Sequence, residues 1–307
     1  MISEIFLFVL GLVLLVKGAD YFVEGGGGLA SRYGVSPTTI GITVIAFGTS
    51  LPEFVVSINA VATGNQGIAL GNILGSNIAN IALVLALCAL IKPVMFSGKL
   101  SRGNVLTEMV LMLFATAVFS ILALRGTLDI LAGIVFLIFF SAILIYLWKS
   151  GAVNNEKIES HGKADYIFIA GGLLGVTIGS QFLLNSAVSI ATFLGIPAFV
   201  IGMSMVAIGT SLPELATSLV AILKDQGGIS VGNILGSNIF NLLLVLGTGA
   251  LIRPLEIPGI TDVLIMAGFS VAAIALFYKS KKGTRFFAAM LLAAYFAYMG
   301  YLFIAGN

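Results

Sequence analysis

The sequence predicts an all-α integral membrane protein with ten transmembrane helices, arranged as two inverted five-helix repeats. Three observations lead to this fold class: composition, segment length and an internal duplication. Of the 307 residues, 59% are hydrophobic and only 9% are charged, whereas a soluble domain carries about 25% charged residues. The net charge of +2 is too small to indicate a nucleic-acid surface. The predicted partner of the chain is therefore the lipid bilayer.

The apolar segments are long enough for helices that cross a bilayer, which need about 20 mostly apolar residues each. Backbone polar groups must be satisfied inside lipid, so segments of this length favour helices over barrel strands. The ten segments are 2–23, 37–62, 68–91, 104–124, 128–148, 166–188, 196–223, 228–252, 259–278 and 286–304. The glycine run at 25–28 is expected to be flexible sequence at the membrane boundary.

Basic residues divide unequally between the two sides of the membrane. One set of alternate loops contains only Arg125 and Arg253. The other set contains Arg32, Lys92, Lys99, Arg102, Lys149, Lys157, Lys163, Lys224, Lys279, Lys281, Lys282 and Arg285. Basic-rich loops face the cytoplasm. We therefore expect a multi-pass protein of the cell membrane with both termini extracellular.

The polar segment 149–165 is expected to be a cytoplasmic linker between two halves, residues 1–148 and 166–307. It contains the only histidine, His161, which is expected to be a solvated loop residue. The only cysteine, Cys88, lies in an apolar run and is expected to pack in the interior.

The two halves match when the chain is shifted by 161 residues. Residues 46–53 then fall on 207–214, and residues 71–78 fall on 232–239. Each half contains five predicted spans, so the second half must enter the membrane from the opposite side. Duplicated halves of opposite topology are typical of secondary transporters.

Glu53 and Glu214 occupy the same position in the two copies, deep within predicted spans. A carboxylate at this depth costs a few kcal/mol or more unless it is compensated, so it is a functional candidate. The other acids, Glu108 among them, are expected near span ends or in loops.

Each motif also contains helix-breaking residues. Pro52 and Pro213 cannot donate a backbone hydrogen bond, and Gly48 and Gly209 weaken the helix further. We expect discontinuous helices 2, 3, 7 and 8, with backbone carbonyls such as that of Ala46 freed around a cation site at the membrane midplane.

Oxygen-bearing side chains surround the two acids in the sequence. Ser76 and Asn80 are four residues apart and share one helix face. Asn77 and Asn238 lie off that face, so a packing role and a site role both stay open for them. The candidate ligands are Glu53, Glu214, Thr49, Thr210, Ser50, Ser211, Ser76, Ser237, Asn80 and Asn241. An all-oxygen set suits hard cations such as Ca²⁺, Na⁺ or Mg²⁺, and an irregular cage suits Ca²⁺ best.

These motifs, GTSLPE at 48–53 and 209–214 with GNILGSN at 71–77 and 232–238, resemble those of the calcium:cation antiporter superfamily. The resemblance is strongest to its prokaryotic sodium/calcium exchanger branch. It implies that Ca²⁺ lies between Glu53 and Glu214, with the backbone carbonyls of Thr49 and Thr210. It also implies sodium sites that share these acids with Ser50, Ser211, Ser76, Ser237 and the carbonyls of Ala46 and Ala207.

The resemblance further implies that the first helix of each half slides across a bundle, and that the sodium gradient drives calcium export. Some members of the family, potassium-dependent relatives among them, have Asp in place of Asn241. Because Asn80 and Asn241 are both neutral here, we expect potassium-independent exchange.

Other functions stay open from the residues alone. A proton/calcium exchanger would use the same buried acids, and a passive cation channel would move ions without a counter-ion. An intramembrane enzyme is disfavoured because no nucleophile–base pair is present. We expect no cofactor, with Ca²⁺ and Na⁺ as the transported substrates. The oligomeric state is not determined, and a monomer is compatible with the sequence.

Overall fold

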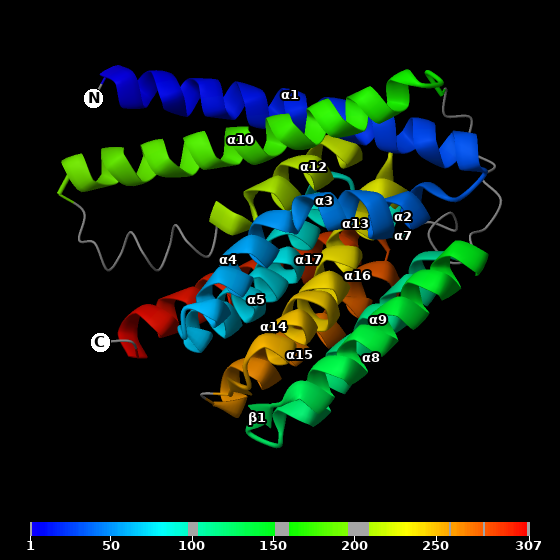
Figure 1. Ribbon diagram of the computed structural model, residues 1–307. Coiled ribbons are helices and arrows are strands. Elements are labelled where there is room, and N and C mark those ends of the chain that lie inside the picture. The colour runs from blue at the N-terminus through cyan, green and yellow to red at the C-terminus, as the bar shows by residue number, and fades with distance from the viewer. Residues whose placement is uncertain are drawn as a thin grey trace.

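The computed structural model describes residues 2–97, 104–150, 160–195, 209–257, 259–278 and 280–305, and these residues are almost entirely helical (Figure 1). The first half contains α1 (Ile2–Tyr33), α2 (Pro37–Ile40), η1 (Gly41–Ile45), α3 (Ala46–Thr49), α4 (Leu51–Ala62), α5 (Gln66–Ala79), η2 (Asn80–Leu85), α6 (Ala86–Ile91), α7 (Val94–Ser97), α8 (Asn104–Ala123), β1 (Thr127–Leu128) and α9 (Ile130–Ser150). The second half contains α10 (Ala164–Phe193), α12 (Leu212–Leu223), α13 (Gly227–Ile239), η4 (Phe240–Val245), α14 (Leu246–Ile252), β2 (Leu255–Glu256), α15 (Ile260–Ala272), α16 (Ile274–Tyr278) and α17 (Lys281–Ala305).

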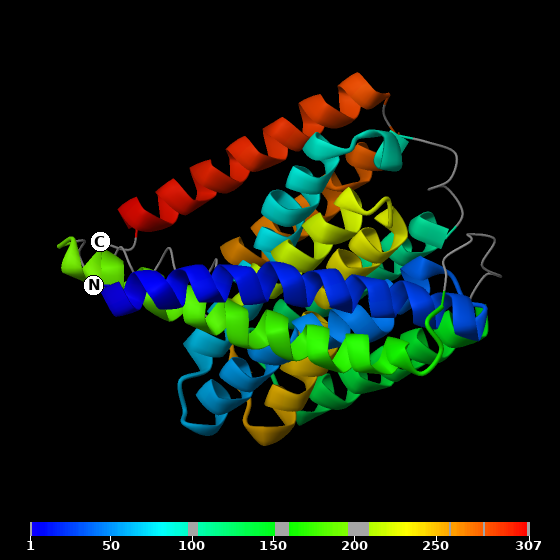
Figure 2. The same ribbon diagram turned by 90° about the horizontal axis from the view of Figure 1, so that it is seen from above.

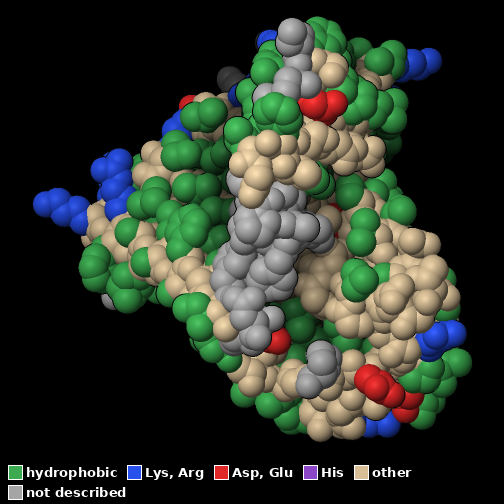
Figure 3. Space-filling view, turned by 90° about the vertical axis from the view of Figure 1, so that its left-hand side faces the viewer, with side chains coloured by type: hydrophobic (Ala, Val, Ile, Leu, Met, Phe, Trp, Pro, Cys, Tyr) green, Lys and Arg blue, Asp and Glu red, His purple; other side chains and the backbone are tan. Residues whose placement is uncertain are grey.

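Most of the predicted spans are present as helices of membrane-crossing length. Among the described residues, eight helices are long and apolar enough to cross a bilayer, and nine if the bent pair Pro37–Thr49 and Leu51–Ala62 forms one span. For the predicted span 196–223, residues 196–208 lie outside the described part of the chain. The outer surface is rich in hydrophobic side chains, and Lys and Arg lie at its margins in the view of Figure 3. The molecule is therefore a multi-span membrane protein.

Helices α1 and α10 lie side by side across the rest of the bundle (Figures 1 and 2). Both are longer than predicted, at 32 and 30 residues. Glycines bring the two backbones into close contact: a Cβ on Gly18 would lie 2.5 Å from the Val176 nitrogen, and one on Gly172 would lie 2.5 Å from the Phe22 nitrogen. Small residues that permit such close approach are common where membrane helices pack.

The glycine run at 25–28 belongs to this contact, and the expectation that it is a flexible boundary segment is wrong. The run is helical. A Cβ on Gly25 would lie 2.7 Å from the Asp165 backbone oxygen, and one on Gly28 would collide with the Asp165 carboxylate. Packing against the start of α10 thus outweighs the intrinsic flexibility of glycine.

The predicted break in the second span is present. Ser50 leaves the helical region (φ −85°, ψ 4°) between α3 and α4, and the two parts are bent by 48°. Ser211 has nearly the same conformation (φ −86°, ψ 4°) at the start of α12. The cause is local: Pro52 and Pro213 lack the N–H that would continue the preceding turn, but they fit the first turn of a new helix.

The third and eighth of the ten predicted spans are not discontinuous, so this part of the prediction is wrong. Residues 66–91 and 227–252 each form one continuous span. Their irregularity is instead a π-helical segment in the middle, η2 in the first and η4 in the second. π-Helical segments inside α-helices are frequent at functional sites. Neither span contains a proline that would force a break.

Repeat-related residues share backbone conformation. Gly34 and Gly195, which are 161 residues apart, have φ of 65° and 77°. Gly64 and Asp225 are also 161 apart, with φ of 86° and 63°. A positive φ is uncommon outside glycine, so its recurrence at Asp225 indicates that the two halves use the same turn.

Short contacts between loops close the bundle at its two ends. Thr127 pairs with Glu256 in the two-stranded β1–β2 ladder. Lys92 forms an ion pair with Asp225 at 2.6 Å. The N- and C-terminal ends lie on the same side of the molecule in both ribbon views (Figures 1 and 2).

The close packing of α1 on α10 can be tested with two adjacent glycines. Gly172→Ala should lower the thermal stability of the protein in lipid nanodiscs by the equivalent of about 1–3 kcal/mol, because the added methyl overpacks the contact with Phe22. Gly171→Ala is the matched control, since a Cβ there meets nothing within 4 Å. Equal melting temperatures for the two variants would show that the α1–α10 contact is loose.

Candidate functional site

Glu53 and Glu214 each lie in the first turn after a helix break. Both are fully buried, with 0% of their surface exposed. Each follows a proline in the first turn of its helix, α4 for Glu53 and α12 for Glu214. The positive end of the helix dipole lies there and favours a negative charge. The helix start that follows Ser50 or Ser211 therefore places a carboxyl group in the protein interior.

The two carboxyl groups have very different hydrogen bonding. Glu214 Oε1 accepts hydrogen bonds from the hydroxyls of Ser50 at 3.2 Å and Ser237 at 3.4 Å. Glu214 Oε2 and both oxygens of Glu53 have no hydrogen-bond partner among the described residues. No ion pair joins either carboxyl to a Lys or Arg of the described chain. Three buried carboxyl oxygens are thus available to a cation.

Hydroxyl groups from one half contact polar groups from the other half. Thr49 donates to Asn233 Oδ1 at 2.9 Å and lies 3.4 Å from the Ser237 hydroxyl. Ser76 and Thr210 contact each other through their hydroxyls at 3.3 Å. Together with the Ser50–Glu214 contact, these pairs bring the two copies of the motif into one site.

Ser211 is buried, and its hydroxyl has no partner among the described residues. The carbonyl of Ala46 is not freed by the break, contrary to expectation. It accepts the Ser50 N–H at 3.0 Å and lies 3.3 Å from the Thr49 hydroxyl. Its second lone pair is the remaining acceptor. Ala207, the repeat partner of Ala46, lies outside the described residues.

A second layer of polar contacts supports the acid-bearing turns. Asn72 donates to Ser57 at 3.0 Å, and its copy Asn233 donates to Ser218 at 2.9 Å. Both amides also lie 3.5 Å from the backbone oxygen of the preceding acid, Glu53 or Glu214. Sequence reasoning missed the two serines, although each lies four residues after its acid, which puts it on the same helix face.

Asn80 and Asn241 are buried, and each donates its amide group across the interface between the halves. Asn80 Nδ2 donates to Asn238 Oδ1 at 3.1 Å, and Asn241 Nδ2 donates to Asn77 Oδ1 at 3.0 Å. Their own oxygens, Asn80 Oδ1 and Asn241 Oδ1, have no partner among the described residues. They add two acceptors to the buried set.

Glu108 lies near the start of its span, as expected, but it is also buried. It is only 2% exposed, and its Oε2 has no described partner. It lies in the second turn of α8, and α8 packs against α13 and α15. Tertiary packing rather than sequence position buries it.

The donors gathered here are carboxylates, hydroxyls, amides and backbone carbonyls. Within the described chain, no group of three His, Cys, Asp or Glu residues could hold a metal by itself. Oxygen ligands of this mixed kind suit hard cations, and Ca²⁺ accepts six to eight of them in irregular geometry. The arrangement can therefore hold and partly dehydrate such a cation.

Comparison with known proteins relates this chain to ion exchangers. The family described as "Sodium/calcium exchanger protein" matches residues 3–149 and 165–304. Sodium/calcium exchanger MaX1 of Methanosarcina acetivorans is 31% identical over 294 residues, covering 81% of this chain and 83% of MaX1. An uncharacterised membrane protein of Methanocaldococcus jannaschii, MJ0091, is 37% identical and covers 94% of each chain. A solved structure of the sodium-calcium exchanger NCX_Mj superimposes with a TM-score of 0.86 at 33% identity, covering 98% of each chain.

The unpartnered carboxyls generate a prediction about binding. Glu53→Gln or Glu214→Gln should weaken the affinity of the purified protein for Ca²⁺ at least about a hundredfold, roughly 3 kcal/mol, because one of two charges facing the cation is lost. Both variants should fold, since an amide is less costly to bury than a carboxylate. Glu256→Gln, at an exposed position in strand β2, is the control for equilibrium binding. Unchanged affinity in either site variant would remove that acid from the site.

Proposed function

Because the chain belongs to the sodium/calcium exchanger family, we propose that it is a secondary active antiporter that exchanges Na⁺ for Ca²⁺. One observation in the molecule carries this function. Two carboxyl groups are fully buried, and no basic side chain of the described chain neutralises them. Buried charges must be paired or bind metal ions, and two carboxylates balance one divalent ion or two monovalent ions.

Calcium would lie between Glu53 and Glu214, with the backbone carbonyls of Thr49 and Thr210 as further ligands. Sodium ions would use the same acids, so that the two ions compete for one charge. Their other ligands would be Ser50, Ser211, Ser76, Ser237 and the carbonyls of Ala46 and Ala207, with Asn80 and Asn241 contributing amide oxygens. The cross-repeat contacts Ser50–Glu214 and Ser76–Thr210 support this assignment.

The fold would consist of ten spans in two inverted halves, 1–148 and 166–307, joined by the cytoplasmic linker 149–165, with the cation site near the midplane. Loop contacts support the inversion. The turn at Gly64 lies beside Arg253, because a Cβ on Gly64 would be 2.9 Å from Arg253 Nη1. The repeat-related turn at Asp225 pairs with Lys92, and the span 66–91 separates Gly64 from Lys92. The two turns thus lie at opposite ends of the bundle.

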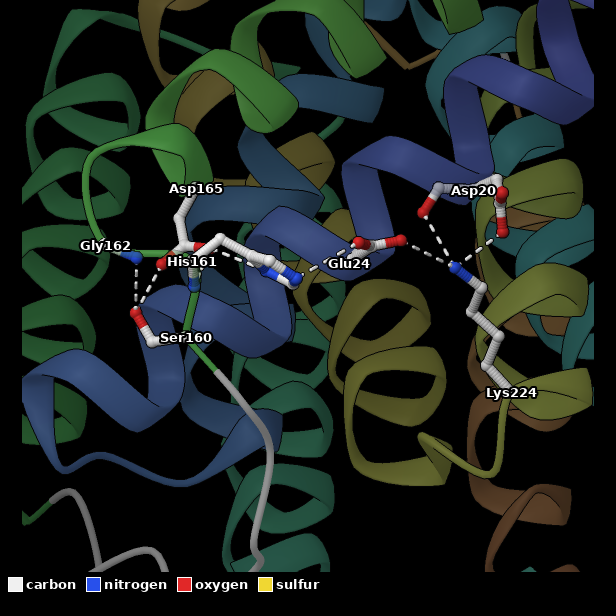
Figure 4. A network of polar contacts seen from close by, with 7 residues as sticks. All are labelled: Asp20, Glu24, Ser160, His161, Gly162, Asp165 and Lys224. Atoms are coloured by element: carbon white, nitrogen blue, oxygen red, sulfur yellow. Dashed lines mark hydrogen bonds and ion pairs between the residues drawn. The ribbon is translucent and has the colours of Figure 1, made fainter.

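Alternating access would arise when α1 and α10 slide together over the bundle. Their glycine-mediated contact with each other supports movement as one unit. An ion-pair network at one end joins this unit to the bundle (Figure 4). Lys224, after α12, contacts Asp20 at 2.6 Å and Glu24 at 3.3 Å on α1, and His161 lies 3.7 Å from Glu24. Sliding would have to break the Lys224 contacts, so they favour the state seen here.

Charge bears on two further parts of the proposal, which are independence of K⁺ and orientation in the membrane. Neutral Asn80 and Asn241 leave the site with two negative charges, which supports potassium-independent exchange. The distribution of Lys and Arg supports location in the cell membrane with both termini extracellular. The protein would work without a cofactor, and a monomer would contain the whole site.

A second candidate is H⁺/Ca²⁺ exchange. The observation that favours it is that both oxygens of Glu53 lack a hydrogen-bond partner among the described residues. A carboxyl group in such a setting can carry a proton as well as a metal ion. A passive cation channel is the remote alternative, and it would conduct without any counter-ion.

The exchange reaction should be measured with purified protein in sealed vesicles. Vesicles loaded with Na⁺ and diluted into Na⁺-free medium should take up Ca²⁺, at unchanged pH and with or without K⁺. Vesicles carrying Glu53→Gln set the background, and Glu256→Gln is the matched control. Uptake driven by a pH gradient in the absence of Na⁺ would favour the proton exchanger, and uptake without any gradient would favour a channel.

The Lys224 contacts predict a shift in the conformational equilibrium. Lys224→Gln should change the ratio of the apparent KM values for Ca²⁺ on the two membrane sides by about two- to fivefold, because partly exposed ion pairs contribute up to about 1 kcal/mol. Lys282→Gln is the control, since no ion pair to another described residue is found for Lys282. An unchanged ratio in Lys224→Gln would mean that the network does not distinguish the two states.

A further inference from the structure

Four buried asparagines form a symmetric arrangement where the two halves meet. Asn77 and Asn80 lie at the junction of α5 and η2, and Asn238 and Asn241 lie at the junction of α13 and η4. All four are 1% exposed or less. Asn77 and Asn238 carry none of the roles proposed above, yet the side chain of each makes three hydrogen bonds to the opposite half, one of them to a methionine sulfur.

Backbone carbonyls determine which way the amides of Asn77 and Asn238 point. Asn77 Nδ2 donates to the backbone oxygen of Asn238 at 3.3 Å, and Asn238 Nδ2 donates to the backbone oxygen of Asn77 at 3.4 Å. The two ends of an amide are nearly identical in shape, so its hydrogen bonds decide its orientation. A carbonyl oxygen only accepts, and the NH₂ end of each amide must therefore face it. The Oδ1 atoms of Asn77 and Asn238 are left pointing the other way.

These two oxygens in turn orient the next pair of amides. Asn77 Oδ1 can only accept, and it takes the Nδ2 donor of Asn241 at 3.0 Å. Asn238 Oδ1 takes the Nδ2 donor of Asn80 at 3.1 Å. The NH₂ groups of Asn80 and Asn241 are thus engaged within the interface. Their oxygens are left buried and without a partner among the described residues.

The orientation of the Asn80 and Asn241 amides affects how the site would bind a cation. An amide oxygen attracts a cation, whereas an amide NH₂ group repels it. With the opposite orientation, Asn80 and Asn241 would turn NH₂ groups to the positions where their unpartnered oxygens now lie. The relay that begins at two backbone carbonyls prevents this orientation.

We propose that Asn77 and Asn238 are positioning residues, which hold the side chains of Asn241 and Asn80 with their oxygens available to the transported cation. Each acts across the halves: Asn77 through Asn241, and Asn238 through Asn80. The proposal rests on the proposed cation site. It differs from simple helix–helix hydrogen bonding, because it requires each residue to act on cation affinity through one specific partner.

A double-mutant cycle on Ca²⁺ affinity tests this pairing. Asn77→Ala should weaken equilibrium Ca²⁺ binding by about tenfold, while Asn77→Ala with Asn241→Ala should be no more than about twofold weaker than Asn241→Ala alone. The matched control cycle combines Asn77→Ala with Asn80→Ala, whose side chains share no hydrogen bond, and there the two factors should multiply. Asn238→Ala with Asn80→Ala gives the same test from the other half if Asn77→Ala does not fold.

Other outcomes contradict the proposal. Factors that multiply in the Asn77/Asn241 cycle, or a lower melting temperature with unchanged affinity, would reduce these residues to packing contacts. Binding is measured on purified protein without a gradient, so it is independent of coupled exchange. Intact binding cycles together with absent sodium-driven flux would contradict the proposed exchange and leave the positioning role in place. Wild-type protein that binds no Ca²⁺ would overturn both.

Discussion

The structure depends on two carboxyl groups buried in the interior without a basic partner. Glu53 and Glu214 are fully buried, and most of their oxygens have no hydrogen-bond partner in the described chain. An isolated charge in such a place is very costly. Its cost can be offset by a cation that the protein takes in and releases again. A stable internal salt bridge would remove that capacity, so the lack of a basic partner is what allows transport.

The helix breaks are the means by which the chain places these acids. Pro52 and Pro213 lie in the first turns of α4 and α12, which places a helix N-terminus and the positive end of its dipole beside each acid. Asn72 and Asn233 then connect each new first turn to Ser57 or Ser218 one turn further along. The rigid part of the site thus comes from helix ends and amide bridges, and not from loops.

Close packing of backbones has two different uses in this fold. Between α1 and α10 it joins two long helices into one unit that lies across the bundle (Figure 1). Between α13 and the segment α2–η1 it brings the motif helices together: a Cβ on Gly41 would lie 2.6 Å from the Ile229 oxygen. Glycine permits both contacts because it has no side chain. The α1–α10 unit and the compact site are therefore built from the same kind of residue.

The sequence by itself determined the membrane environment, the repeat at an offset of 161 residues, the break in the second span and the burial of Glu53 and Glu214. Hydropathy, duplication and prolines without an N–H donor can all be found from the order of the residues alone. Only the tertiary structure decided the rest. It showed that the spans 66–91 and 227–252 are unbroken and contain π-helical segments, that residues 25–28 belong to a closely packed helix, and that Glu108 is buried. It also decided the orientation of Asn80 and Asn241, since the carbonyls that fix their partners belong to residues 161 positions apart in the chain. Such contacts depend on which surfaces meet, and no pattern within one segment contains that information.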